Sequence, residues 1–141
     1  MSIWNSVRNS EEIKELMDNF GGFDKSCIIS VAYKSGAYVG EIGEHFINDD
    51  MTVSVVLQRK SLGYVQSIEL FFRDIKLLRL EPLGSNYECY LTDASVKCEN
   101  GIVTFTNWDD FDTINADAGV LIIKAGSMMW RDVSEKMSYT A

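Results

Sequence analysis

A period-two alternation of apolar and polar side chains dominates the middle of the chain. Apolar residues stand at positions 51, 53, 55 and 57, and again at 68, 70 and 72, with mostly polar residues between them. Because successive side chains of a β-strand point to opposite faces of a sheet, each run predicts a strand with one buried and one hydrated face. Antiparallel sheets commonly have such a hydrated face, whereas parallel sheets are covered on both. The pattern therefore predicts an antiparallel architecture.

Further strands are expected at residues 27–33, 87–91, 95–98, 102–106, 120–125 and 128–133. The dipeptide Asn100-Gly101 lies between two of them and is the strongest short hairpin signal, because both residues tolerate positive φ. Leu78 and Leu80 continue the strand at 68–72 after a bend that we expect near Asp74. Turns at short intervals predict an α+β, mostly β fold: an antiparallel sandwich or open barrel of about seven to eight strands with one N-terminal amphipathic helix.

The helix is predicted to begin near Ser10 and to run for about ten residues. Asn9 is a good N-cap residue, and Glu12 three positions later approximates a capping box. Apolar side chains recur at i, i+3, i+4 and i+7, namely at Ile13, Leu16, Met17 and Phe20. Gly21 and Gly22 then supply a left-handed stop. The narrow apolar stripe predicts a helix that packs on a sheet.

The segment 35–50 fits neither periodicity. It contains three glycines, Gly36, Gly40 and Gly43, and the only histidine of the chain, His45. A short helix and a long hairpin loop between the first two strands are both open, and the loop is the preferred interpretation. The glycine spacing matches neither the dinucleotide-binding nor the P-loop pattern, so phosphate binding is not expected here.

Composition places the chain among ordinary globular proteins. Its 141 residues are 46% hydrophobic and 24% charged, which predicts one domain spanning residues 1–141 with its own core. The formal net charge of −8 disfavours nucleic-acid binding, because such binding depends on Lys and Arg that neutralise phosphates. The N-terminus lacks an apolar leader and no apolar run is long enough to span a membrane, so a cytoplasmic protein is expected.

Few residues are suited to catalysis or metal binding. A nucleophile with a histidine base would have to use His45, and no serine lies in a nucleophile-elbow motif. Asp110-Phe111-Asp112 opens like a calcium-binding loop, but Ile114 and the lack of a glutamate at the twelfth position break the pattern. The three cysteines form no Cys-x-x-Cys pair and are expected to be reduced: Cys27, Cys89 and Cys98. We therefore predict no catalytic residue, metal or cofactor.

The segment around Trp108 is the leading candidate for partner binding. Between positions 93 and 117 there are six acidic residues against Lys97 alone, a local net charge of −5. Aromatic rings beside acids suit an interface, where the ring anchors the partner and the charge selects it. The predicted partner-binding residues are Trp108, Asp109, Asp110, Phe111, Asp112 and Asp117. The alternative is a hydrated acidic face whose rings, like Trp4 and Trp130, cap the open ends of a sandwich.

Four segments occur in an order that is similar to a known group of proteins. They are FDKS at 23–26 before a strand, TVSVVL at 52–57, SIELFFRDI at 67–75 and LTDASV at 91–96. This order resembles small bacterial proteins, mostly uncharacterised, of which some are assigned as immunity proteins of polymorphic toxin systems. The resemblance covers about half of the chain and implies a mostly-β fold without known catalytic activity. The chain departs from the group in its Asp-Lys-Ser at 24–26, where a histidine-aspartate pair is often seen, and in the insert at 35–50.

The leading hypothesis is a non-enzymatic protein-binding module, in particular an immunity protein that binds a basic toxin or another basic protein. A small apolar ligand between helix and sheet is one alternative. A homo-oligomeric assembly, such as a homodimer in which an exposed strand edge pairs across a two-fold axis, is another. An enzyme that uses carboxylates alone would need two close acids in a cleft, one with a raised pKa.

Overall fold

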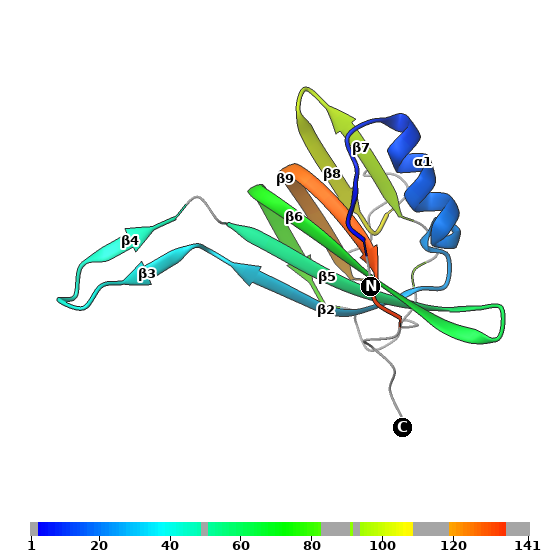
Figure 1. Ribbon diagram of the computed structural model, residues 1–141, viewed down its shortest axis with the longest axis horizontal. Helices are drawn as coiled ribbons and strands as arrows, with labels where there is room; N and C mark the ends of the chain where they lie inside the picture. The colour runs from blue at the N-terminus through cyan, green and yellow to red at the C-terminus, as the bar shows by residue number, and fades with distance from the viewer. Residues whose placement is uncertain (1–2, 49–50, 83–90, 92–93, 109–118, 135–141) are drawn as a thin grey trace.

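The computed structural model describes residues 3–48, 51–82, 91, 94–108 and 119–134, and it has the α+β, mostly β architecture expected from the sequence (Figure 1). The elements in chain order are β1 (Asn5–Ser6), α1 (Ser10–Asn19), a 3₁₀ turn η1 (Gly21–Phe23), β2 (Cys27–Lys34), β3 (Ala37–Val39), β4 (His45–Ile47), β5 (Thr52–Ser61), β6 (Tyr64–Glu81), β7 (Ser95–Glu99), β8 (Ile102–Thr106) and β9 (Val120–Asp132). Seven strands form one antiparallel sheet in the order β2-β5-β6-β9-β8-β7, with β1 paired to β9. Among the described strands, β2 and β7 stand at the two ends of this order and do not pair with each other.

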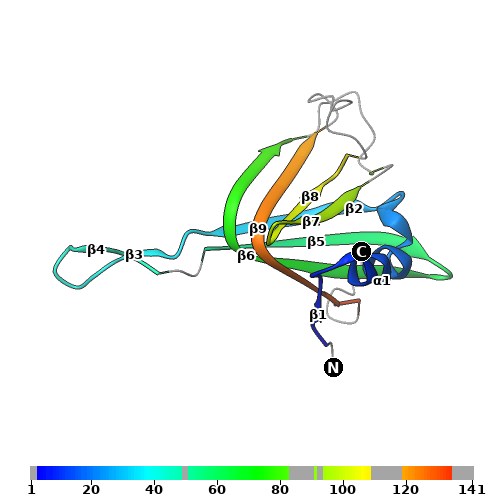
Figure 2. The ribbon, with the colours of Figure 1, turned by 90° about the horizontal axis from the view of Figure 1, so that it is seen from above.

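The two longest strands, β6 and β9, bend together near their middle. Asp74 of β6 has a φ of 56°, and the register of β6 against β9 shifts between Ile75 and Leu77. On β9, Gly126 faces this irregularity, and a Cβ at that position would lie 2.5 Å from Oδ2 of Asp74. A bulge on one strand and a glycine on its neighbour allow a sheet to turn a corner. Figure 2 shows both strands curving away from the plane of β2 and β5. The bend expected near Asp74 is confirmed.

The bend explains why residues 120–125 and 128–133 read as two strands in the sequence. They are one strand, β9, so the prediction of two was wrong. Leu121 and Ile123 point into the core before the bend, whereas Met128 and Trp130 do so after it. Val120 and Ile122 are buried as well, so the first part of β9 is a continuous apolar run, whereas Met128 and Trp130 alternate with more exposed residues.

The helix begins at Ser10 as predicted, and its cap is the expected one. The side chain of Asn9 accepts a hydrogen bond of 3.0 Å from the backbone N–H of Glu12. The carboxylate of Glu12 reaches back to the backbone N–H of Arg8 at 2.9 Å, one residue beyond the capping-box position. After the helix, Gly21 and Gly22 adopt φ values of 59° and 66° and turn the chain. No helix within the described residues is long and apolar enough to cross a membrane.

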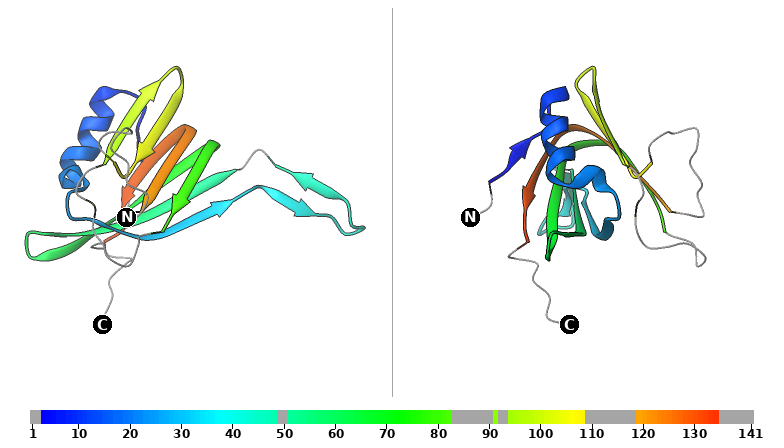
Figure 3. Two further views of the ribbon diagram at one scale, coloured as in Figure 1. Left: turned by 180° about the vertical axis from the view of Figure 1, so that it is seen from behind. Right: turned by 90° about the vertical axis from the view of Figure 1, so that its right-hand side faces the viewer.

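The core fills the angle between the two halves of the bent sheet, and α1 and η1 close one side of it (Figure 3). Four rings connect these parts, with centroid separations of 5.2 Å for Phe20–Phe23, 5.6 Å for Phe23–Phe105 and 6.1 Å for Phe105–Phe72. All four side chains are fully buried. Helix, 3₁₀ turn and both halves of the sheet therefore share one core.

The hairpin at Asn100-Gly101 is confirmed, since the two residues have φ values of 52° and 77° between β7 and β8. The strand predicted at 87–91 lies outside the described residues except for Leu91. That residue exchanges backbone hydrogen bonds of 2.7 Å with Lys25 and Ser26, beside the start of β2. Leu91 is thereby held next to the start of β2.

Candidate protein-binding site

Trp108, the first of the predicted partner-binding residues, is part of a hydrogen-bonded junction between β8 and β9. Its indole Nε1–H donates to the carbonyl oxygen of Gly119 at 3.0 Å, and its ring is only half-buried. The preceding residue, Asn107, accepts from the backbone N–H of Leu121 through Oδ1 at 2.9 Å. The backbone N–H of Asn107 donates to the carbonyl of Leu121 at 3.2 Å. The indole thus helps to hold the two ends of the 109–118 segment together.

The remaining predicted partner-binding residues lie outside the described part of the chain: Asp109, Asp110, Phe111, Asp112 and Asp117. The structure places the two residues that flank this segment, Trp108 and Gly119. The hydrogen bond from the Trp108 indole to the Gly119 carbonyl joins them. These residues therefore stay a prediction.

The other two tryptophans differ from each other. Trp130 is 7% exposed and belongs to the core. Trp4 is 37% exposed, and the guanidinium carbon of Arg131 lies 4.3 Å from its ring centroid. A cation stacked on an exposed ring stabilises the ring's position and covers one of its faces. Neither ring is a free apolar anchor.

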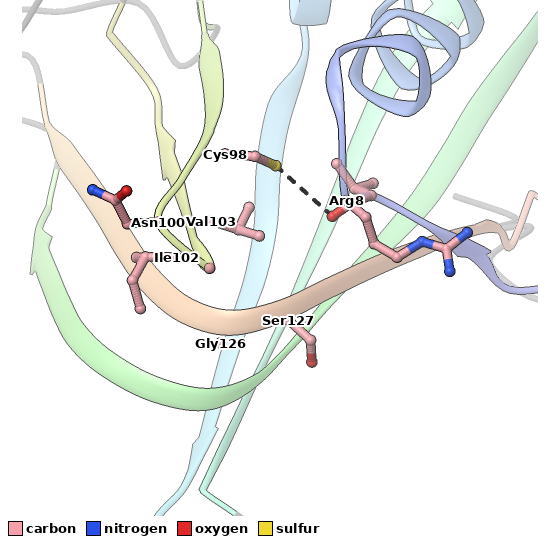
Figure 4. Close-up of a pocket in the computed structure, with 9 residues that line it drawn as sticks. Arg8, Cys98, Asn100, Ile102, Val103, Gly126 and Ser127 are labelled. Carbon is pink, nitrogen blue, oxygen red and sulfur yellow. Dashed lines mark hydrogen bonds between the residues drawn. The ribbon is translucent and has the colours of Figure 1, made fainter.

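A surface pocket of about 380 Å³ lies between the start of α1 and the β7–β8 hairpin (Figure 4). Cys98 projects into this region, with its sulfur 4.0 Å from the carbonyl oxygen of Val7. Burial raises the pKa of the Cys98 thiol, and the nearby Glu12 carboxylate raises it further. A nucleophilic cysteine needs a lowered pKa, because the thiolate is the reactive form. The geometry of this pocket gives Cys98 no activation.

A second, more open depression of about 430 Å³ lies on the outer face of the sheet. Lys97, Thr104 and Lys124 stand in register across β7, β8 and β9, and Lys76 of β6 lies beside them. The sequence pattern did not reveal this basic row in an acidic chain, because the lysines come from three separate strands. Only the strand register brings them together.

His45 is exposed on β4. Within the described residues, no three side chains of His, Cys, Asp or Glu converge so as to hold a metal ion.

The largest departure from a compact body is a two-stranded extension between β2 and β5. We call residues 35–48 the arm. Its strands β3 and β4 pair antiparallel, with Tyr38 opposite Phe46, and they form a separate two-stranded sheet. Figure 1 shows the arm projecting far beyond the bent sheet. The hairpin interpretation of segment 35–50 is therefore right about the connection, but the segment contains strands rather than only a loop.

The glycines of the arm shape its two ends. At the base, Gly36 has a φ of 79° and its carbonyl accepts from the backbone N–H of Asn48 at 2.8 Å. At the tip, the N–H of Gly40 donates to the carbonyl of Glu44 at 2.8 Å, and the Glu44 side chain lies where a Cβ of Gly40 would stand. Gly43 has a φ of 88°, which disfavours other residues. The glycines that resembled a weak phosphate motif thus build a tight hairpin.

The arm exposes large apolar side chains to an unusual degree. No residue from 35 to 48 is buried, although the rings of Tyr38 and Phe46 stack with centroids 5.1 Å apart. The exposed fractions are 49% for Tyr38, 63% for Val39, 89% for Ile42, 45% for Phe46 and 67% for Ile47. A two-stranded hairpin has no second layer on which to bury such residues. The arm is the strongest candidate binding site on the described surface.

Comparisons with protein families, with curated proteins and with solved structures find no match for this chain. The candidate site therefore depends on the geometry and chemistry of the arm itself. Sequence reasoning singled out segment 108–117 and missed the arm's apolar surface. The signal for the arm was available, since apolar pairs at 38–39 and 46–47 flank a glycine-bounded turn. That pattern does not distinguish a projecting hairpin from one folded against the core.

Proposed function

We propose that the chain is a non-enzymatic protein-binding module, and that its arm inserts apolar side chains into a basic surface of a protein partner. The observation that carries this proposal is the set of five large apolar side chains, each 45–89% exposed, on a segment without a buried residue. The register places Tyr38 and Phe46 on one face of the hairpin and Val39 and Ile47 on the other, so both faces offer apolar side chains, and exposed apolar patches mark interaction sites. An immunity protein that neutralises a basic toxin is the form of this function that the sequence resemblance implies.

The negative charge of the arm and of the residues that follow it supports a basic partner. Residues 35–58 contain no Lys or Arg, and their acidic residues are Glu41, Glu44, Asp49 and Asp50. Glu41 is exposed at the tip of the arm. Acidic groups around apolar anchors accelerate association with basic surfaces and select against acidic ones. The acidic segment 109–117 adds further negative charge to the chain and would act in the same direction.

The alternative of a small apolar ligand between helix and sheet is less well supported. Leu16 and Phe20 of the helix side and Phe23 of η1 are fully buried in that region. Native side chains that pack a core leave little room for a ligand. The apolar surface offered to a binding partner is on the arm instead.

An armless variant tests the proposal. Gly36 and Asn48 face each other at the base of the arm, with the N–H of Asn48 bonded to the carbonyl of Gly36. This is the geometry that flanks a two-residue hairpin turn, so Asn-Gly can replace residues 37–47. The tagged intact and armless chains are used to capture proteins from a cell extract at low and at high salt. We expect a basic protein that binds the intact chain, is released by salt and is absent from the armless sample.

Point variants separate the apolar side chains from the arm's backbone. Ile42→Ser removes the most exposed apolar residue of the arm, and Ile3→Ser is the matched control, because Ile3 is 77% exposed elsewhere. We expect Ile42→Ser to weaken capture and Ile3→Ser to leave it unchanged. Equal capture by the intact, armless and Ile42→Ser chains would contradict the proposal.

A further inference from the structure

The open depression on the outer face of the sheet concentrates positive charge in an acidic chain. The chain as a whole has 13 Lys and Arg against 21 Asp and Glu. Three lysines nevertheless line this depression, namely Lys76, Lys97 and Lys124. Glu99 is the one acidic residue among the described residues that line it. Three positive charges and one negative charge give the depression a local net charge of +2, on a chain whose net charge is −8.

The strand register brings two of these lysines to the same point. Lys97 of β7 pairs with Thr104 of β8, and Thr104 pairs with Lys124 of β9. Figure 1 shows these three strands side by side. Because neighbouring strands lie about 4.8 Å apart, the backbones of the two lysines are about 10 Å apart with Thr104 between them. Flexible lysine side chains at this spacing can both reach an anion that lies above Thr104.

Protection of a sheet edge does not explain Lys124. Lysines on edge strands keep sheets from pairing with one another, but β9 lies inside the sheet between β6 and β8. Lys124 is exposed and forms no ion pair with any described residue. Lys76, in contrast, pairs with Asp74 at 3.0 Å and contributes less of its charge to the depression. Lys124 therefore offers its full charge to a ligand.

The shape of the outer face also suits a small ligand. Two residues along the strands from the basic row, Thr106 pairs with Ile122 on the same face, and these side chains are 1% and 5% exposed. Lys124 is exposed, so the depression lies where the covered part of this face ends. Ile102 adds an apolar side chain to its lining and Asn100 an amide. A volume of about 430 Å³ lies within the usual range of small-molecule sites.

The groups in this depression are suited to a phosphate. Lysine binds phosphate as a point charge, and a hydroxyl or a primary amide can donate hydrogen bonds to further phosphate oxygens. A phosphate monoester presents three acceptor oxygens and close to two negative charges at neutral pH, whereas a carboxylate presents two oxygens and one charge. The local charge of +2 therefore matches a phosphate monoester better than a carboxylate.

We propose that this depression binds the phosphate group of a small phosphate monoester. The phosphate lies above Thr104 and between Lys97 and Lys124. The organic part of the ligand extends towards Asn100 and Ile102 at the β7–β8 hairpin. The site is on the body of the protein and separate from the arm, so this binding goes beyond the proposed function of the arm.

An NMR titration with glycerol phosphate tests the site, and glycerol is the matched compound without a phosphate. Both are added to the intact, isotope-labelled chain in a phosphate-free buffer at constant ionic strength, because salt screens exposed charges. We expect saturable changes in the amide signals of Lys97, Thr104 and Lys124. The dissociation constant should be about 1–10 mM, since exposed charge pairs each contribute little. Glycerol should cause no such changes.

Two results of this titration would overturn the proposal. One is the absence of saturable changes in the signals of the basic row. The other is a set of equal changes at exposed lysines elsewhere, such as Lys14 and Lys60, because glycerol phosphate would then associate with lysines in general.

Two variants with opposite expected effects separate ligand binding from folding. Lys124→Gln removes a cation from the depression and should raise the dissociation constant by about threefold or more. Glu99→Gln removes the carboxylate that repels the phosphate and should lower the constant by about twofold. Lys60→Gln removes an exposed lysine of β5 and is the matched control without effect. A misfolded variant does not bind more tightly, so equal constants for the intact chain, Lys124→Gln and Glu99→Gln would contradict the site.

A phosphorylated protein side chain presents the same chemistry, and a short peptide with one phosphoserine distinguishes this source. We expect the peptide to bind no more tightly than glycerol phosphate, because the depression has the volume of a small-molecule site. Binding of the peptide that is tighter by about tenfold or more would assign the depression to a phosphorylated protein and overturn the proposal of a small ligand.

The armless variant distinguishes a failure of this inference from a failure of the proposed function. It keeps every residue of the depression, so we expect it to bind glycerol phosphate as the intact chain does. A weaker affinity would show that the arm forms part of the site and that the placement on the basic row is wrong. Capture of a basic protein by the arm is a separate result and does not depend on phosphate binding.

Discussion

The body of the protein and its arm each contain a close pair of aromatic rings, edge-to-face in the body and stacked in the arm, but only the pair in the body is buried. Phe23 and Phe105 in the body have centroids 5.6 Å apart and are fully buried. Tyr38 and Phe46 in the arm stack at 5.1 Å, yet each is nearly half exposed. Ring pairs contribute modestly by themselves, and most of the stabilisation comes from the area removed from water. A short distance between two rings therefore does not distinguish a core from a binding surface.

The difference arises from what surrounds each pair. The body bends one sheet and closes it with a helix, so rings from four elements exclude water together. The arm has two short strands, and no other described strand pairs with them. Its apolar residues therefore contribute little to folding, and they are available to a partner. Five changes to the chain test this division between body and arm.

Truncating one ring in each region should give the clearest contrast. Phe105→Ala removes a fully buried ring that contacts Phe23 and Phe72, and we expect a loss of about 3–5 kcal/mol in the free energy of unfolding. Phe46→Ala in the arm should cost less than about 1 kcal/mol, because the ring is already hydrated. Urea denaturation measures both. Similar losses for the two variants would show that the arm is part of the folding unit.

Gly126→Ala tests how much the stability of the body depends on close packing at the corner of the sheet. The new methyl group would lie 2.5 Å from Asp74 Oδ2 and 3.0 Å from its Cβ, so we expect a loss of about 1–3 kcal/mol. Asp74→Gly removes that contact and also suits the φ of 56°. The double variant should therefore recover most of the stability in thermal denaturation. A double variant no more stable than Gly126→Ala would mean that something other than the Asp74 side chain disfavours the methyl group.

Asn9→Ala tests the helix that covers the body. Loss of the hydrogen bond from the Glu12 N–H should reduce the free energy of unfolding by about 1 kcal/mol. Asn9→Asp keeps an acceptor at the cap and is the matched control. Chemical denaturation of both variants checks this, and a loss of the same size in Asn9→Asp would point away from capping.

Removing the arm should change the stability of the body little. The armless variant keeps every residue of the buried core, so we expect its free energy of unfolding to lie within about 1 kcal/mol of the intact chain. Urea denaturation at a single low protein concentration is the measurement. A larger loss would mean that the arm stabilises the body and is not solely a binding element.

The smallest effect is expected from Cys98 at alkaline pH. Folding raises the pKa of this thiol, so the unfolded chain releases its proton first as the pH rises above about 8.5. The stability associated with the neutral thiol is thus complete at lower pH and declines as the pH rises towards the folded pKa. The difference in unfolding free energy between the intact chain and Cys98→Ala should shrink between about pH 7 and pH 10. A constant difference would indicate an unperturbed thiol.

The sequence predicted correctly those helix ends and turns that are determined by a few neighbouring residues. Asn9 and the Gly21-Gly22 pair bound the helix because a cap and a left-handed stop act on neighbouring backbone groups. The Asn-Gly turn between β7 and β8 has a cause of the same kind. In contrast, the sequence pattern divided β9 at residues 126–127, because the pattern alone does not show that the strand continues through the corner where Gly126 faces Asp74.

For the candidate sites too, the sequence showed the composition but not the three-dimensional arrangement. Acidic composition around Trp108 was visible in the sequence, but the indole's hydrogen bond to Gly119 depends on how β8 meets β9. The alternation of 51–57 and 68–72 determined by itself that the chain forms antiparallel strands with one buried face, since a side chain's face follows from its position. That residues 35–48 project from the body with their apolar side chains exposed is known only from the three-dimensional fold. Exposure depends on whether another layer covers a strand, and no local pattern encodes that.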